Sequence, residues 1–144
     1  MAFVNFVRVA ATVTATGGAS QAFFSDRSIV GGYIESIVYR RGAVTTATTT
    51  TSGISTAAHI NIRGALSGTP IFDGTATGDV TWYPRAAAMG TTGNTLGYSS
   101  AATPPVIPVP IPIVNERIRV EFTSGGAASA GGVHSIIDIL YSGV

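Results

Sequence analysis

Residues 104–122 read PPVIPVPIPIVNERIRVEF, and this stretch decides the fold class of the 144-residue chain. Its second half places Ile118, Val120 and Phe122 at every other position, with charged residues between them. A period of two residues is typical of a β-strand that has one buried and one exposed face. We therefore predict a strand over residues 117–122, with the apolar residues facing the core.

The first half of the same stretch alternates proline with aliphatic residues. Pro108, Pro110 and Pro112 occupy every other position, and Val109 and Ile111 lie between them. Because proline has no backbone N–H to donate, it does not occupy the middle of a hydrogen-bonded sheet. The segment must be extended, and we expect either an edge strand or a polyproline II helix.

Strand patterns also dominate the rest of the chain. Runs rich in Val, Ile, Thr and Tyr predict strands over residues 3–14, 29–40, 57–64, 79–83 and 133–141, with a strand or a solvated loop over 44–52. We expect Gly31 and Gly32 to form a bulge or a bend inside the second of these. About seven or eight strands with glycine-rich turns predict an all-β, single-domain, antiparallel β-sandwich over residues 1–144. A jelly-roll-like order is favoured, and an immunoglobulin-like order stays open.

Composition weighs against several classes of partner. Charged residues make up 10% of the chain, against about 25% in an average soluble domain. All eight basic residues are arginines, and the net charge is +1. Such a weak net charge does not concentrate nucleic acid or anionic lipid. The absence of cysteine excludes disulfides, thiolate catalysis and cysteine-ligated zinc.

The mean hydropathy of +0.39 raises the question of a membrane segment. The two longest uncharged stretches contain a threonine tract or several glycines and prolines, so neither offers about 20 continuous apolar residues. The N-terminal run lacks a basic region, and Asn5 and Arg8 interrupt it, so it does not match a signal peptide. We expect a protein made in the cytoplasm, with neither nucleic acid nor membrane as its partner.

The sequence shows no catalytic, cofactor-binding or metal-binding constellation, and we expect a protein that is not an enzyme. Its two histidines, His59 and His134, lack further ligands at close spacing. His134 and Asp138 share a strand face, but lie about 13 Å apart along it. The glycine-rich segments lack the lysine and the strand–loop–helix context of a phosphate-binding loop. If the chain were an enzyme, one of the two histidines would be its general base.

Three aromatic residues, Trp82, Tyr83 and Tyr98, suggest an alternative function. Together they could stack on a sugar, which would make the chain a carbohydrate-binding or adhesion domain. The competing interpretation is that adjacent Trp and Tyr residues on a strand point in opposite directions, one into the core and one outward.

The low charge and high apolar content instead favour assembly, because a chain of this composition has little polar surface to offer as a free monomer. The candidate contacts are Phe3, Phe6, Arg40, Arg41, Arg85, Val109 and Ile111. Residues 1–12 could form an N-terminal arm or an edge strand for contact between subunits. Deletion of residues 2–12 should then abolish assembly without affecting the fold.

The order of several features resembles that of small structural proteins of tailed bacteriophages. These features are Gly31-Gly32 before residues 34–39, the Thr81-Trp82-Tyr83-Pro84-Arg85 turn, the run from Ile111 through Asn115-Glu116-Arg117 to Val120, and a glycine- and alanine-rich turn before the last strand. The pattern is similar to that of β-sandwich proteins that decorate, or cement, the capsid.

The resemblance implies a homo-oligomer, with a trimer favoured, that sits on the outer surface of the virion. Its partner would be the major capsid protein, and it would clamp neighbouring capsomers through buried interfaces whose weak contacts add up as avidity. The resemblance brings no catalytic residues and no cofactor. A place in the tail, neck or fibre is the alternative within the same class.

Overall fold

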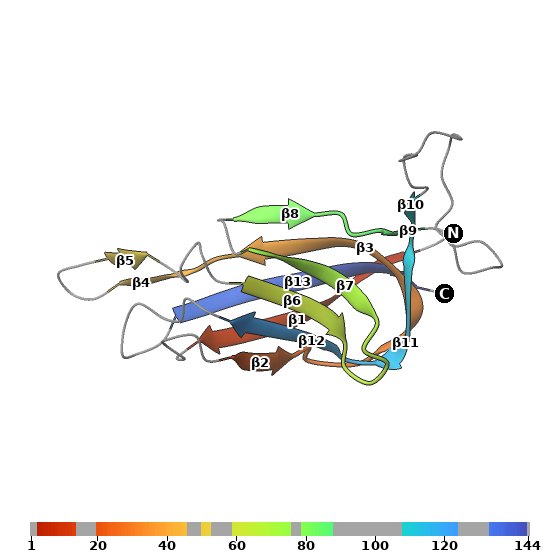
Figure 1. The fold of residues 1–144 in the computed structure, drawn as a ribbon, viewed down its shortest axis with the longest axis horizontal. Coiled ribbons are helices and arrows are strands. Elements are labelled where there is room, and N and C mark those ends of the chain that lie inside the picture. The colour runs from red at the N-terminus through yellow and green to blue at the C-terminus, as the bar shows by residue number, and fades with distance from the viewer. Residues whose placement is uncertain are drawn as a thin grey trace, which may run out of the picture.

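The computed structural model describes residues 3–13, 20–45, 50–52, 59–75, 79–87, 108–123 and 133–143, which form thirteen β-strands and no helix. These described ranges accordingly contain no helix with the length and apolar character needed to cross a membrane. Two antiparallel sheets make up most of the structure (Figure 1).

The larger sheet has five strands. Its order is β1 (Phe3–Val13), β13 (Val133–Gly143), β3 (Ile29–Arg40) and β11 (Ile111–Glu116). The fifth strand, β8 (Val80–Trp82), pairs with residues 37–39 of β3, beyond the part that pairs with β11. The second sheet has four strands, in the order β2 (Gln21–Phe24), β12 (Ile118–Thr123), β6 (His59–Gly64) and β7 (Pro70–Thr75).

The order of pairing is that of a jelly roll. β1 pairs with β13, β2 with β12, β3 with β11 and β6 with β7. The first strand of the sequence thus pairs with the last, and the pairs continue in this way toward the middle of the sequence. An antiparallel hairpin rolled up on itself gives this nested pattern. The prediction of an antiparallel β-sandwich of jelly-roll type is confirmed, and the immunoglobulin-like order is excluded.

Two short ribbons lie at opposite ends of the sandwich (Figure 1). One is the hairpin of β4 (Ala43–Thr45) and β5 (Thr50–Ser52), which answers the open question about residues 44–52. The other pairs β9 (Ala86–Ala87) with β10 (Pro108–Val109). Residues 88–107, which follow β9 and precede β10 in the chain, lie outside the described residues.

Apolar residues at alternate positions fill the space between the sheets. Ile118, Val120 and Phe122 are buried as predicted, and Ile60 and Ile62 of β6 pack with them. The observed β1, β3, β6, β8, β12 and β13 confirm the strands predicted for their regions. β2 and β7 were missed, because one has only four residues and the other is interrupted by a proline and a glycine.

β1 is an edge strand of the larger sheet, but it is not a detachable arm. Val7, Val9 and Ala11 are at most 1% exposed and belong to the core. Asp26 also ties β1 to the segment after β2, because its backbone N–H donates to the Arg8 carbonyl and its Oδ1 accepts from the Arg8 N–H. The expectation that deletion of residues 2–12 leaves the fold intact is therefore wrong.

The proline segment forms the opposite edge of the larger sheet. β11 has β3 on one side only, and the exposed Pro112 lies opposite Tyr33. An edge position suits proline, because its missing N–H is not required there. The edge-strand interpretation is confirmed for the residues of β11.

The start of β3 changes phase at the predicted glycines. Ile29 and Ile34 are both fully buried although they lie five residues apart, so the inward side of the strand switches between them. Gly32 permits a close approach here, because a Cβ at this position would lie 2.3 Å from the Ser142 carbonyl oxygen. A register shift against β13 follows at Glu35, which has no partner residue there. Figure 1 shows β3 curving at this end.

Candidate assembly surface

The outer side of the five-stranded sheet is largely apolar. Residues that pair across antiparallel strands share one side of the sheet, so the register identifies this surface. It comprises Val4, Phe6, Arg8, Ala10 and Thr12 on β1, Ile136, Asp138, Leu140 and Ser142 on β13, Tyr33, Ser36, Val38 and Arg40 on β3, Thr81 on β8 and Pro112 on β11. We call this set the apolar face. Val4 is 64% exposed, and Phe6 and Tyr33 are each 48% exposed.

An ion pair neutralises the charges in the middle of the apolar face. Arg8 Nε donates to Asp138 Oδ1 at 2.8 Å, and the Arg8 Nη2 group donates to Oδ2 at 3.0 Å. The hydrogen bond to Asp138, and then its negative charge, raise the pKa of Arg8 above its ordinary value. The guanidinium also lies 5.8 Å from the centroid of the Phe6 ring. The pair therefore adds little net charge to the surface around it.

The outer side of the four-stranded sheet has the opposite character. Its residues, which we call the polar face, are His59, Asn61 and Arg63 on β6, Asp73 and Thr75 on β7, and Arg119, Glu121 and Thr123 on β12. His59 Nε2 contacts Asp73 Oδ1, and Arg119 pairs with Glu121 at 2.5 Å. Ala22 and Phe24 on the edge strand β2 are its apolar neighbours.

Two of the predicted contact residues lie on the apolar face. Phe6 is half-exposed and Arg40 is exposed, and both project from the outer side of the larger sheet. Phe3 belongs to β1, but its side chain lies outside the described residues. Val109 is half-buried in the short β10 ribbon. Ile111 was predicted as an assembly contact, yet it is 3% exposed and belongs to the core, because the inward side of β11 carries its isoleucines.

Arg41 and Arg85 are engaged by neighbouring strands. The Arg41 N–H donates to Asp79 Oδ1 at 2.9 Å, and the Arg41 carbonyl accepts from the Ser135 hydroxyl at 2.6 Å. The Arg85 guanidinium donates to the Glu35 carbonyl at 3.1 Å, beside the bulge in β3. These contacts give both arginines a role within the fold.

Trp82 and Tyr83, the two aromatic residues of the carbohydrate alternative that the structure describes, have different surroundings. Trp82 stacks on Phe72 with ring centroids 4.0 Å apart, and on Tyr39 at 5.4 Å. Tyr39 belongs to the larger sheet and Phe72 to the smaller, so the indole of Trp82, at the end of β8, contacts both sheets. Tyr83 points outward and is 70% exposed, while Tyr98 lies outside the described residues. Trp82 therefore stabilises the sandwich and is not presented to a sugar.

The histidines also differ from what spacing alone suggested. His59 meets Asp73 from the neighbouring strand, a contact that no sequence spacing reveals. The side chain of His134 lies outside the described residues, and Asp138 is occupied by Arg8. Within the described ranges, no three His, Asp or Glu residues lie close enough together to hold a metal ion.

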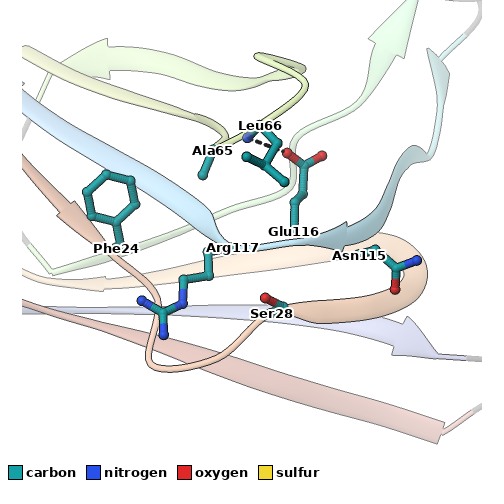
Figure 2. Close-up of a pocket in the computed structure, with 7 residues that line it drawn as sticks. All are labelled: Phe24, Ser28, Ala65, Leu66, Asn115, Glu116 and Arg117. Atoms are coloured by element: carbon teal, nitrogen blue, oxygen red, sulfur yellow. Dashed lines mark hydrogen bonds between the residues drawn. The ribbon is translucent and has the colours of Figure 1, made fainter.

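A pocket of about 320 Å³ opens at the end of the sandwich where the chain passes from one sheet to the other (Figure 2). Its lining comes from the end of β2, the link to β3, the turn after β6 and the junction of β11 with β12: Phe24, Ser28, Ala65, Leu66, Asn115, Glu116 and Arg117. We call it the corner pocket. Asn115 makes the junction by adopting a left-handed backbone conformation with φ 52°.

A buried carboxylate holds one wall of the corner pocket in place. Glu116 is 4% exposed, and its Oε2 accepts from the N–H groups of Leu66 and Ser67, each at 2.9 Å. Its Oε1 accepts from the Ser67 hydroxyl at 2.7 Å. Gly64 is required beside it, because a Cβ there would lie 2.6 Å from the carboxylate. Burial raises the pKa of Glu116, but the hydrogen bonds from Ser67 and Leu66 outweigh this and lower it overall.

Sequence reasoning did not single out the corner pocket. Arg117 falls in the strand predicted over residues 117–122, Glu116 enters only the run that carries the phage resemblance, and Leu66 belongs to neither. A glutamate at the end of an edge strand, just before the next strand begins, was the available signal. It became meaningful only when the fold brought residues 64–68 to it.

The chain matches no protein-family model and no curated protein sequence. Its fold is similar to that of a chain in a solved structure titled "Cyanophage Pam1 capsid asymmetric unit", with a TM-score of 0.53. The similarity covers 99% of this chain and 86% of that chain, at 14% sequence identity. The expected likeness to the β-sandwich structural proteins of bacteriophages is confirmed at the level of the fold.

Proposed function

We propose that this chain is a structural protein of a bacteriophage virion, and that it decorates the outside of the capsid as a cement protein. The observation that carries the proposal is the contrast between the apolar face and the polar face of one jelly roll. The similarity of the fold to a chain from a cyanophage capsid supports it. The function is binding, with no catalytic step.

The mechanism is burial of the apolar face against protein. Removing apolar surface from water stabilises an interface by about 25 cal/mol per Å². The described part of the apolar face keeps its central charges paired with each other, so a partner need not supply a counter-charge for Arg8 or Asp138. The proposed partners are the major capsid protein and further copies of this chain, with a trimer implied by the resemblance. Many copies on a repeating shell would add their contacts as avidity.

The decisive experiment is the copy number of this chain relative to the major shell protein in particles banded on a density gradient. Quantitative mass spectrometry supplies the ratio. We expect hundreds of copies per particle, which a role on the surface lattice requires. A handful of copies would instead place the protein in the neck, tail or fibre. Its complete absence from particles would overturn the proposal of a virion protein.

A further inference from the structure

The corner pocket combines three features that the proposed capsid role does not use. It exposes apolar side chains, it has a wall fixed by a buried charge, and it carries an arginine whose guanidinium has no partner among the described residues. None of its residues belongs to the apolar face. Each feature bears on what the pocket would hold.

Leu66 is the most exposed of the large apolar side chains that the structure describes, at 84%. It sits on the turn between β6 and β7, and Phe24, 50% exposed, lines the same pocket from β2 (Figure 2). A single exposed leucine on a loop is ordinary. Two exposed apolar side chains that line one pocket form a place where an apolar side chain from outside would lose water on contact with both.

The turn that carries Leu66 is held rigidly. Besides the three hydrogen bonds to Glu116, the Gly64 N–H donates to the Thr69 carbonyl at 2.9 Å and the Ala65 N–H donates to the Arg117 carbonyl at 2.9 Å. An ionised carboxylate is costly to bury unless hydrogen-bond donors satisfy it, and here the donors of the turn do so. A wall already fixed before binding loses little conformational entropy when a ligand arrives, which favours binding.

Arg117 gives the pocket its charge preference. Its side chain is exposed, and no described residue provides a hydrogen-bond or ion-pair partner for the guanidinium. The one carboxylate in the lining, Glu116, is already satisfied by donors from the turn. Free guanidinium groups favour two-pronged contacts with carboxylates. A carboxylate that pairs with Arg117 would therefore have to come from the ligand.

We infer that the corner pocket is a docking site for an extended segment of a partner protein that carries an aliphatic side chain beside a carboxylate. The aliphatic side chain lies between Phe24 and Leu66, and the carboxylate pairs with Arg117. The inference goes beyond the proposed capsid role and does not depend on it, because no residue that lines the pocket belongs to the apolar face.

The test uses the peptide acetyl-Gly-Leu-Asp-Gly-amide, with the Asn analogue acetyl-Gly-Leu-Asn-Gly-amide as its uncharged match. Each is titrated into the full-length ¹⁵N-labelled protein up to about 10 mM, a range suited to weak fragments, and backbone amide shifts are followed by NMR. We expect saturable shifts confined to residues 24–28, 64–68 and 115–117, which surround the pocket. The Asp peptide should bind about three- to tenfold more tightly than the Asn peptide, because its charge pairs with Arg117.

Two arginine variants make the test specific. Arg117→Gln should remove the preference for Asp over Asn, whereas Arg40→Gln, which changes an exposed arginine on the apolar face, should leave it unchanged. Leu66→Ala should weaken both peptides equally, and this residue is too exposed for the change to affect folding. The inference is overturned if no saturable shift occurs, if the two peptides bind alike to the unmodified protein, or if both arginine variants behave alike. Copy number on particles is independent of all these outcomes.

Discussion

The two outer sides of this jelly roll differ in the way their charges are used. On the polar face, the side chains of His59 and Asp73 are 46% and 65% exposed, and those of Arg119 and Glu121 are 27% and 23% exposed. On the apolar face, the Asp138 side chain is only 12% exposed, and Arg8 covers it. Both sheets bury equally regular apolar rows between them, so the difference does not come from the core. It shows which side of the sandwich suits contact with protein and which suits water.

The largest expected effect is on the free energy of unfolding, and it tests whether Trp82 holds the two sheets together. Trp82→Ala should lower the free energy of unfolding by about 2–4 kcal/mol, because the indole stacks on both Phe72 and Tyr39 but is only partly buried. Tyr83→Ala is the matched control on the next residue, and it should change stability by less than about 0.5 kcal/mol. Chemical denaturation followed by circular dichroism measures both. Equal effects would mean that Trp82 does not hold the sheets together.

An intermediate effect is expected for Glu116, a carboxylate that lies on neither outer face. Glu116→Gln should cost about 1–3 kcal/mol at neutral pH, because Leu66 and Ser67 lose a charged acceptor. Glu121→Gln on the polar face is the control and should cost about 0–1 kcal/mol, as expected of a surface pair.

The pH dependence of the Glu116 variant follows from the direction of the pKa shift. The pKa of Glu116 in the folded protein lies below the ordinary value of 4.5, so its protonation favours the unfolded chain. Its stabilising contribution is therefore complete above about pH 4.5 and is lost as the pH falls through the folded-state pKa. The difference between the wild-type protein and Glu116→Gln should shrink as the pH falls from 7 to 3. A constant difference over this range would contradict the assignment.

The smallest expected change in free energy tests the comparison of the faces directly. Val4→Asp and Thr75→Asp each place one new carboxylate at an exposed position on an edge strand, the first on the apolar face and the second on the polar face. Val4→Asp should weaken association with capsid particles at least about tenfold, equivalent to about 1.4 kcal/mol. Thr75→Asp should leave it unchanged. Co-sedimentation with particles that lack the protein measures both, and equal binding by the two variants would show that the faces do not differ in function.

Much of the fold could be predicted from the sequence, because it depends on the alternation of apolar and polar residues along each strand. The strand over residues 117–122 and the edge placement of Pro112 both follow from which backbone groups must be buried or paired. β2 and β7 were not predicted, because β2 has only four residues and β7 begins with a proline and contains a glycine, so neither shows a clear alternation of its own. Ile111 was assigned to the wrong side for a similar reason. Its neighbour Pro112 fixed an edge strand but did not reveal which side of that strand faces the core.

The sequence by itself determined that the chain is all-β, that it carries few charges, and that its proline segment is extended, because these follow from composition, from the missing N–H of proline and from a period of two residues. Only the tertiary structure decided where the charges are used. Arg8 meets Asp138, His59 meets Asp73, and Glu116 meets the turn at Leu66 across separations of 130, 14 and 50 residues along the chain. Such partners are set by strand order and register, and a strand placed differently would give its own side chains other neighbours.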